Sequence, residues 1–251
     1  VRTYYTQQLC TPTRAALMTG RYPHRYGMHH YVLAGYKDYG LPLNETTLAE
    51  KLRAVGYRTA HVGKWHLGVY APEVTATRRG FETSFGYSNG EEDHVVHSLE
   101  GLYDFYDSQD FATPGPALNG THSAFVFSAK AVDRVVRHAS RLGDVATTND
   151  PLFLYYALQN CHEPLEPPPG YAQSLRCAAI CNDTTYDGTR PPFCGMAAAA
   201  DDAIGNLTDA VDATLGLSTT LLVIAGDNGG LVRAGGNNWP LRGQKAQPWE
   251  G

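Results

Sequence analysis

The segment CTPTRAALMTGR, residues 10–21, carries the first side chains suited to catalysis. Pro12 fits the first turn of a helix, so Cys10 should lie at a helix N-terminus, where unpaired N–H groups and the helix dipole favour negative charge. Arg14 lies four residues further on and can reach back to that end. The pattern predicts an electropositive site around a reactive cysteine; the alternative is a buried structural cysteine before an ordinary helix.

Three further polar segments each follow an apolar run: residues 63–66 (GKWH), 159–163 (QNCHE) and 226–229 (GDNG). Alone, Lys-x-His or Asp-Asn-Gly-Gly is more often a surface turn. Ligands gather at the carboxyl ends of parallel strands, so three such segments together favour one shared site. By contrast, we expect Glu91, Glu92 and Asp93 to form a solvated face and Trp65 and Trp239 to serve in packing.

The elements that must position these segments alternate between helix and strand. Residues 58–62 resemble a short strand ending at Gly63, while residues 152–158 and 220–225 are apolar runs typical of strands buried on both faces. Helices are predicted for residues 47–55, 123–142 and 196–215, and long surface loops for residues 107–120 and 163–192. This order indicates an α/β protein with a mainly parallel sheet.

The composition is that of a globular protein, because 43% of the 251 residues are hydrophobic and only 18% are charged. The net charge of -5 gives no electrostatic reason to expect nucleic acid or an anionic membrane as a partner. No run approaches the roughly 18–20 apolar residues of a membrane span. Because the net charge is negative, an anionic substrate would need cationic side chains close to its binding site.

Taken in order, these motifs resemble those of the sulfatase family. The family signature appears as Cys10-x-Pro12-x-Arg14 followed by TGR, and a second signature as GYRTAHVGKWHLG, residues 56–68. The likeness continues through residues 77–81, 162–164, 227–230 and 235–243, and the later segments look most like the arylsulfatase B branch. It implies an alkaline-phosphatase-like α/β fold, with a mainly parallel central sheet and helices on both faces.

The resemblance implies that a formylglycine-generating enzyme oxidises Cys10 to formylglycine in the secretory pathway. In the hydrate of that group, one hydroxyl would attack sulfur and the other would help to expel sulfate. Asp227 and Asn228 would bind one calcium ion together with the Cys10-derived group, and Arg14 would hold this environment.

The same resemblance assigns the sulfate and the protons to four further side chains. Lys64, His162 and Lys245 would contact the sulfate oxygens. His66 would take a proton from the second hydroxyl, and His162 would protonate the leaving alcohol. The expected activity is sulfuric ester hydrolysis on a sulfated sugar or an aryl sulfate. The alternatives are a phosphoester or phosphonate ester hydrolase, or an inactive relative that binds sulfated glycans.

Residues 1–251 are expected to form an incomplete catalytic domain. The family places an Asp-Asp pair of metal ligands on a strand before the cysteine motif, and a smaller carboxy-terminal domain after the segment seen here. Asp201 and Asp202 lie in a predicted helix and cannot take that role.

The remaining cysteines and four glycosylation sequons point to the secretory pathway. Cys161, Cys177, Cys181 and Cys194 cluster in one stretch and predict one or two disulfides; a zinc site is the alternative. The sequons lie at Asn44, Asn119, Asn182 and Asn206. We therefore expect a lysosomal or extracellular protein.

Overall fold

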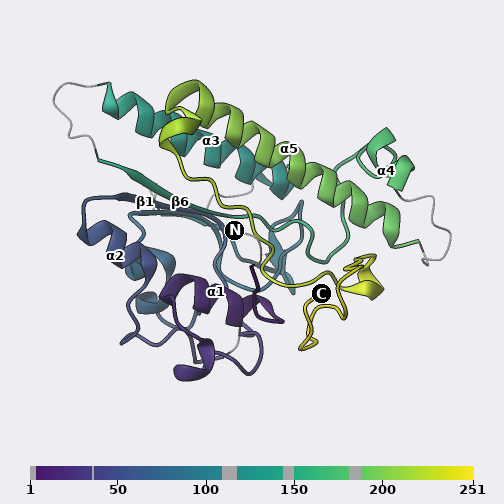
Figure 1. Ribbon diagram of the computed structural model, residues 1–251, viewed down its shortest axis with the longest axis horizontal. Coiled ribbons are helices and arrows are strands. Elements are labelled where there is room, and N and C mark those ends of the chain that lie inside the picture. Colours follow the sequence, from purple (N-terminus) through teal and green to yellow (C-terminus); the bar gives the residue numbers. More distant parts are fainter. Residues whose placement is uncertain (1–3, 36, 109–117, 144–149, 181–187) are drawn as a thin grey trace.

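The computed structural model describes the chain except residues 1–3, 36, 109–117, 144–149 and 181–187. Figure 1 shows a central sheet between two helical layers, with α3 (Ser123–Leu142) and α5 (Arg190–Thr214) on one face and α1 (Cys10–Thr19) and α2 (Leu48–Ala54) on the other. The predicted α/β fold with helices on both faces is confirmed. None of the described helices is long and apolar enough to cross a bilayer.

The sheet has the strand order β5-β2-β1-β6. Its strands are β1 (Arg58–Lys64), β2 (Thr83–Tyr87), β5 (Tyr106–Asp107) and β6 (Leu152–Ala157). β1 runs parallel to both β2 and β6, whereas β5 pairs antiparallel with β2. Gly63 has φ 103°, and a Cβ there would overlap the carbonyl of Ala157, so the β1–β6 pair requires glycine at this position.

The other elements are small. They are β3 (Ser98–Leu99) and β4 (Leu102–Tyr103), which pair with each other, the helix α4 (Leu175–Ile180), and 3-10 turns at Pro23–Arg25, Pro72–Val74, Ala76–Arg79, Leu217–Thr219 and Val232–Ala234. The strands β2 to β5 were not predicted from the sequence.

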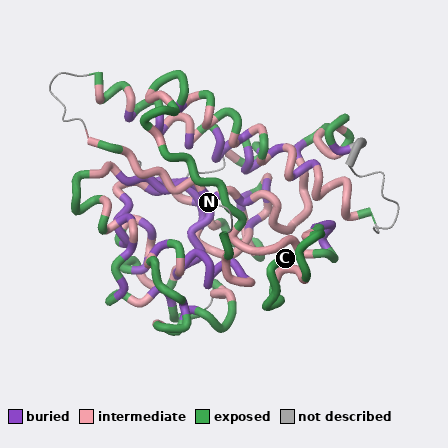
Figure 2. Tube along the Cα trace, viewed as in Figure 1, coloured by how far each residue is buried: buried purple, intermediate pink, exposed green. Residues whose placement is uncertain are grey.

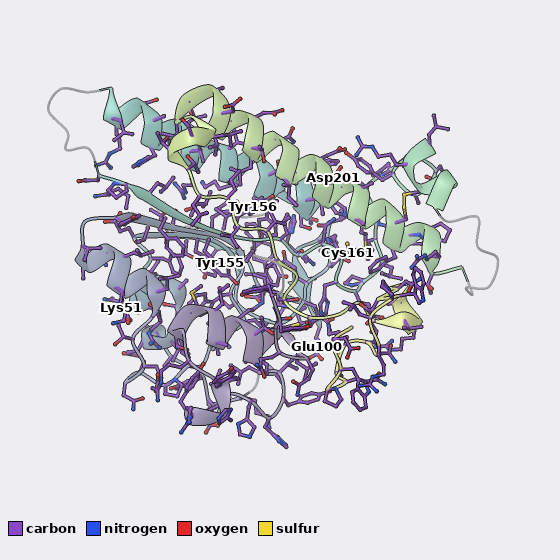
Figure 3. The ribbon with its side chains drawn as sticks, in the orientation of Figure 1. Lys51, Glu100, Tyr155, Tyr156, Cys161 and Asp201 are labelled. Atoms are coloured by element: carbon purple, nitrogen blue, oxygen red, sulfur yellow. A yellow bond between two sulfur atoms is a disulfide. The ribbon has the colours of Figure 1, made fainter. Side chains whose placement is uncertain are left out.

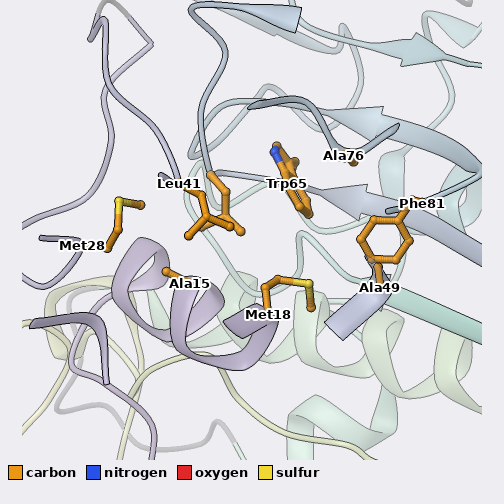
Figure 4. Close-up of a cluster of buried hydrophobic side chains, with 9 residues drawn as sticks. Ala15, Met18, Met28, Leu41, Ala49, Trp65, Ala76 and Phe81 are labelled. Carbon is orange, nitrogen blue, oxygen red and sulfur yellow. The ribbon is translucent and has the colours of Figure 1, made fainter. Parts of the chain in front are cut away.

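The sheet separates two apolar cores because neighbouring residues of a strand point to opposite faces. On the side of α1 and α2, Trp65 and Phe81 pack with Met18, Leu41 and their neighbours (Figure 4). On the side of α3, the second core contains Val62, Phe85, Tyr87, Phe105, Val126, Phe127 and Ala131. Full burial of Met18 or Phe81 stabilises the fold by about 1.5–3 kcal/mol each.

β6 contributes alternate residues to both cores. Phe153 and Tyr155 pack on the first, and Leu154 and Tyr156 on the second. Tyr155 and Tyr156 are labelled in Figure 3. The strand predicted at residues 152–158 is therefore confirmed. Most of its residues are only partly buried, because β6 has a hydrogen-bonded neighbour on one side alone among the described strands.

Local sequence signals are present at the helix ends. Thr47 and Glu50 form a capping box at the start of α2, and Gly56 follows that helix with φ 94°. α3 has the predicted bounds. α5 begins at Arg190 rather than at residue 196, because the two prolines at its start fit a first helical turn. The stretch predicted as a loop over residues 163–192 thus contains α4 and the beginning of α5.

The strand predicted for residues 220–225 is wrong. These residues pair with no described strand, and they form an exposed stretch after α5 that is green in Figure 2. Leu221 is 87% exposed and Val223 is 74% exposed. Apolar, β-branched side chains form a strand only where a neighbouring strand and a covering layer are present, so composition alone overstated this one.

Candidate functional site

Cys10 is the first residue of α1 and is almost fully buried. Leu9, the preceding residue, offers no side-chain cap, so the first N–H groups of the helix add positive potential around the thiol. Sγ of Cys10 lies 3.3 Å from Oδ1 of Asn228, 218 residues away in the sequence. The predicted helix N-terminus and the predicted proximity to the GDNG segment are both present.

Arg14 connects three parts of the chain. Its Nε and Nη2 donate to Oδ2 of Asp227 at 3.1 and 2.9 Å, and its Nη1 donates to the carbonyl of Lys64 at 2.8 Å. Nη1 also donates to the hydroxyl of Tyr155 at 3.3 Å. Burial alone would raise the pKa of Asp227, but Arg14 and Lys64 outweigh it and hold that pKa below its usual range. Asp227 therefore stays ionised.

Lys64 and His66 stand at the end of β1, and both are buried. His66 has φ 57°, which is a strained backbone for a residue with a side chain. Its Nε2 lies 2.8 Å from the carbonyl of Leu33, so Nε2 carries the proton and Nδ1 is left as an acceptor. Among the described residues, that buried Nδ1 makes no hydrogen bond of close geometry, although the His66 side chain interacts with Cys10 strongly enough to lower the pKa of the thiol. Burial and Lys64 lower the pKa of His66 to about 4.

His162 follows β6 and meets Lys245 from the C-terminal segment. Nζ of Lys245 lies 3.0 Å from Nε2 of His162. The backbone of that segment is fixed by Lys245 N donating to Gly230 O at 3.3 Å and Ala246 N donating to Gln8 O at 2.9 Å. Lys245 is thus held next to the GDNG turn and next to the residues that precede Cys10.

The electrostatic effect of this arrangement converges on Cys10. Burial raises the pKa of the Cys10 thiol, but Lys64, the side chain of His66 and Lys245 lower it more, to about 6. The two lysines come from different elements, so the positive field at the thiol is a product of the tertiary structure. All eight residues singled out in the sequence are joined in one network: Cys10, Arg14, Lys64, His66, His162, Asp227, Asn228 and Lys245.

Sequence reasoning missed or misjudged several neighbours of the site. Tyr155 was predicted only as part of a strand, although its hydroxyl accepts from Arg14. Glu92 is buried rather than solvated, whereas Trp239 is 84% exposed rather than packed. The alternation along β6 could have indicated Tyr155, but burial of Glu92 depends on contacts that no short pattern encodes.

Among the described residues, one disulfide is present, between Cys177 and Cys194. It confirms the predicted disulfide chemistry of this stretch and contradicts the alternative zinc site, because a cysteine in a disulfide is not a thiolate ligand. Cys161 is a free thiol, and Cys181 lies outside the described residues. Of the glycosylation sequons, Asn44, Asn119 and Asn206 are exposed, and Asn182 falls in an undescribed stretch.

The donors at this site suit a hard cation in part. Asp227 and Asn228 supply oxygen atoms next to the side chain of Cys10, which is the ligand type that calcium prefers. In the part of the chain that the structure describes, no three His, Cys, Asp or Glu side chains gather as a metal site. Calcium binds about 6–8 oxygen atoms. Asp227 and Asn228 can therefore supply some, but not all, of the oxygen ligands of a calcium ion.

The sequence model of the sulfatase family matches residues 1–251. Arylsulfatase J of Mus musculus is 36% identical, in an alignment that covers 99% of this chain and 40% of the relative. Arylsulfatase A of Homo sapiens is 30% identical, with 99% of this chain and 48% of the relative covered. The chain thus spans about half the length, or less, of these curated relatives.

Solved structures show the same architecture. Ps i-CgsB, in a complex with k-i-k-neocarrahexaose, superposes with a TM-score of 0.83 at 26% identity, covering 99% of this chain and 54% of that one. The PsFucS1 sulfatase from Pseudoalteromonas sp. gives a TM-score of 0.69 at 23% identity, covering 98% of this chain and 51% of that one. The predicted alkaline-phosphatase-like fold is confirmed.

Proposed function

Because this chain belongs to the sulfatase family, we propose that the protein containing it hydrolyses sulfate esters, with residues 1–251 as part of its catalytic domain. The substrate class is a sulfated sugar or an aryl sulfate. Related proteins carry arylsulfatase names, and one related structure holds an oligosaccharide. The observation that carries the proposal is the cluster itself, in which side chains of α1, β1, the segment after β6 and the C-terminal segment meet around Cys10.

Cys10 is the precursor of the nucleophile in this proposal. Oxidised to formylglycine and hydrated, it would supply two hydroxyl groups, one to attack sulfur and one to release sulfate afterwards. Nδ1 of His66 suits this modification, because it is a buried acceptor on a side chain that interacts with Cys10, and its opposite nitrogen is held by Leu33. His66 would accept the proton from the second hydroxyl.

Asp227 and Asn228 would hold a calcium ion with the Cys10-derived group. Such a cation lowers the pKa of a bound hydroxyl and neutralises charge that develops on sulfate. Arg14 acts on a proposed ligand of the cation, since its two hydrogen bonds to Oδ2 orient the Asp227 carboxylate and keep it ionised. The arginine therefore positions the ligands rather than contacting the substrate.

Lys64 and Lys245 would bind the sulfate oxygens as point charges, and the burial of Lys64 strengthens its attraction by excluding water. His162 lies within hydrogen-bond distance of Lys245 and therefore at the same anion. It would contact the sulfate and donate a proton from Nε2 to the leaving alcohol oxygen as the bond from sulfur to that oxygen breaks.

The maturation and location of the protein follow from this chemistry. A formylglycine-generating enzyme would act on the segment around Cys10 in the secretory pathway, and the mature protein would be lysosomal or extracellular. Glycosylation at Asn44, Asn119 and Asn206 agrees with their exposure. The branch within the family stays a prediction.

Mass spectrometry of the tryptic peptide of residues 3–14, from protein made in its native secretory pathway, tests the proposal. We expect formylglycine in place of Cys10, and finding only the thiol would overturn the mechanism. Comparing hydrolysis of nitrophenyl sulfate with nitrophenyl phosphate then separates a sulfatase from a phosphoester hydrolase. Modification without either activity would instead favour a glycan-binding relative.

A further inference from the structure

The segment after β2 brings a carboxylate to His162. Oε2 of Glu91 lies 3.5 Å from Nδ1 of His162, with the glutamate side chain 47% exposed and the histidine side chain 21% exposed. The two residues follow different strands, so the contact depends on the fold. An imidazole facing a carboxylate on one nitrogen and the reaction on the other is the arrangement that supports proton transfer.

Hydrogen bonds fix where the proton of His162 lies. Nδ1 is 2.8 Å from the carbonyl oxygen of Glu163, which can only accept, so Nδ1 carries a hydrogen. Nε2 is 3.0 Å from the ammonium of Lys245, which can only donate, so Nε2 is an acceptor. The imidazole is therefore neutral here, and a proton for the leaving group must first be added at Nε2.

The surroundings oppose that second proton. Burial, Lys64 at the end of β1 and Lys245 in the C-terminal segment lower the pKa of His162 to about 4, while Glu91 acts in the opposite direction. A bound sulfate would offset the two lysines, which leaves Glu91 as a protein group that favours the imidazolium.

The other titratable side chains near His162 do not replace Glu91. Nε2 of His94 lies 3.4 Å from the carbonyl of His162, and burial lowers the pKa of His94 to about 3, so that ring is neutral. The carboxylate of Glu163 pairs with Arg233 at 3.2 Å for both of its oxygens. Glu163 thus lies next to His162, as Glu91 does, but its carboxylate is paired with Arg233.

We propose that Glu91 is a positioning residue for His162: its carboxylate lies beside Nδ1 and stabilises the imidazolium, while the carbonyl of Glu163 accepts the Nδ1 hydrogen, so that Nε2 points its proton at the leaving group. This role rests on the proposed function, in which His162 is the general acid. In that step the bond between sulfur and the leaving oxygen breaks, its electron pair stays on oxygen, and the proton moves from Nε2 to that oxygen.

The first test does not need enzymatic activity. Ring resonances of His162 are titrated by NMR in the full-length protein with Cys10→Ala, and assigned by His162→Gln. Glu91→Gln should lower the pKa of His162 by about half a unit, as expected for a partly exposed charge pair, and Glu91→Asp should restore part of the shift. The matched control Glu163→Gln should leave the titration unchanged. No shift in Glu91→Gln, or an equal shift in Glu163→Gln, overturns the proposal.

The second test uses the active enzyme and an aryl sulfate. A general acid must be protonated, so activity is lost as the pH rises through its pKa. A lower pKa moves that loss to lower pH. Glu91→Gln should shift the alkaline limb of kcat/KM by the same half unit, about threefold in rate on that limb, with the control unchanged. A shifted titration with an unshifted limb overturns the catalytic role. An inactive parent enzyme refutes the proposed function, while the titration still decides the coupling.

Discussion

Arg14 organises the site through hydrogen bonds to other site residues and takes no direct part in the proposed chemistry. Its guanidinium bridges α1, the end of β1 and the GDNG turn, through Lys64 O and Asp227 Oδ2. Lysine keeps the charge but lacks the planar fork that makes these bonds together. At this scale, function depends on hydrogen-bond geometry more than on charge.

Arg14→Lys should therefore leave buried acceptors unsatisfied. We expect the free energy of unfolding to fall by about 1–3 kcal/mol and arylsulfatase activity to fall at least tenfold. Urea denaturation and steady-state kinetics measure both effects. Arg176→Lys is the control, because Arg176 pairs with Asp202 on the exposed surface and should change neither. Equal activity in Arg14→Lys and the parent would contradict the assigned role.

Gly90 is a second residue on which the site depends. A Cβ at this position would lie 2.7 Å from Cε1 of His66, so Gly90→Ala should displace that ring. We expect at least a tenfold loss of kcat with a small change in melting temperature. Gly205→Ala offers a matched control, since no atom lies within 4 Å of the added methyl group. The role of the close contact would be excluded if the Gly90 variant kept full activity.

At the scale of elements, strand ends and a helix start place the side chains proposed to be catalytic, and a disulfide joins α4 to α5. Cys177 in α4 and Cys194 in α5 are joined across 17 residues of sequence. The disulfide closes a loop and so reduces the number of conformations open to the unfolded chain. The lower entropy of the unfolded state stabilises the folded one.

Replacing both cysteines with alanine should lower the free energy of unfolding by about 3 kcal/mol, the value for a closed loop of this length. Chemical denaturation under oxidising conditions measures the change. Cys161→Ala, which removes a free thiol, should have a smaller effect. A double variant as stable as the parent would show that the bond does not constrain the unfolded state.

At the scale of the whole molecule, residues 221–225 form an exposed apolar stretch of the surface. Leu221, Val223 and Ile224 are each more than two-thirds exposed. An extended apolar segment without a paired neighbour favours association with other chains.

The 251-residue chain should accordingly self-associate in solution. Sedimentation velocity should show species larger than the monomer, and Leu221→Lys with Val223→Lys should reduce them. Leu175→Lys removes a comparably exposed leucine on α4 and should have little effect. A parent chain that is monomeric across the measured concentrations would contradict this expectation.

Short-range signals in the sequence determined much of the framework. The start of α1 at Cys10, the capping box of α2, the bounds of α3 and the strand before His162 all follow from residues within a few positions of one another. The ordered motifs also identified the family and the eight residues that the fold brings into one network.

Tertiary structure alone decided which side chains share an environment. Glu92 is buried and Trp239 is exposed because of how distant parts of the chain pack. Tyr155 contacts Arg14, and Glu91 contacts His162, for the same reason. That no described strand pairs with residues 220–225 has the same origin. Backbone propensity is set locally, whereas burial and electrostatic surroundings are set by whatever the rest of the chain packs alongside.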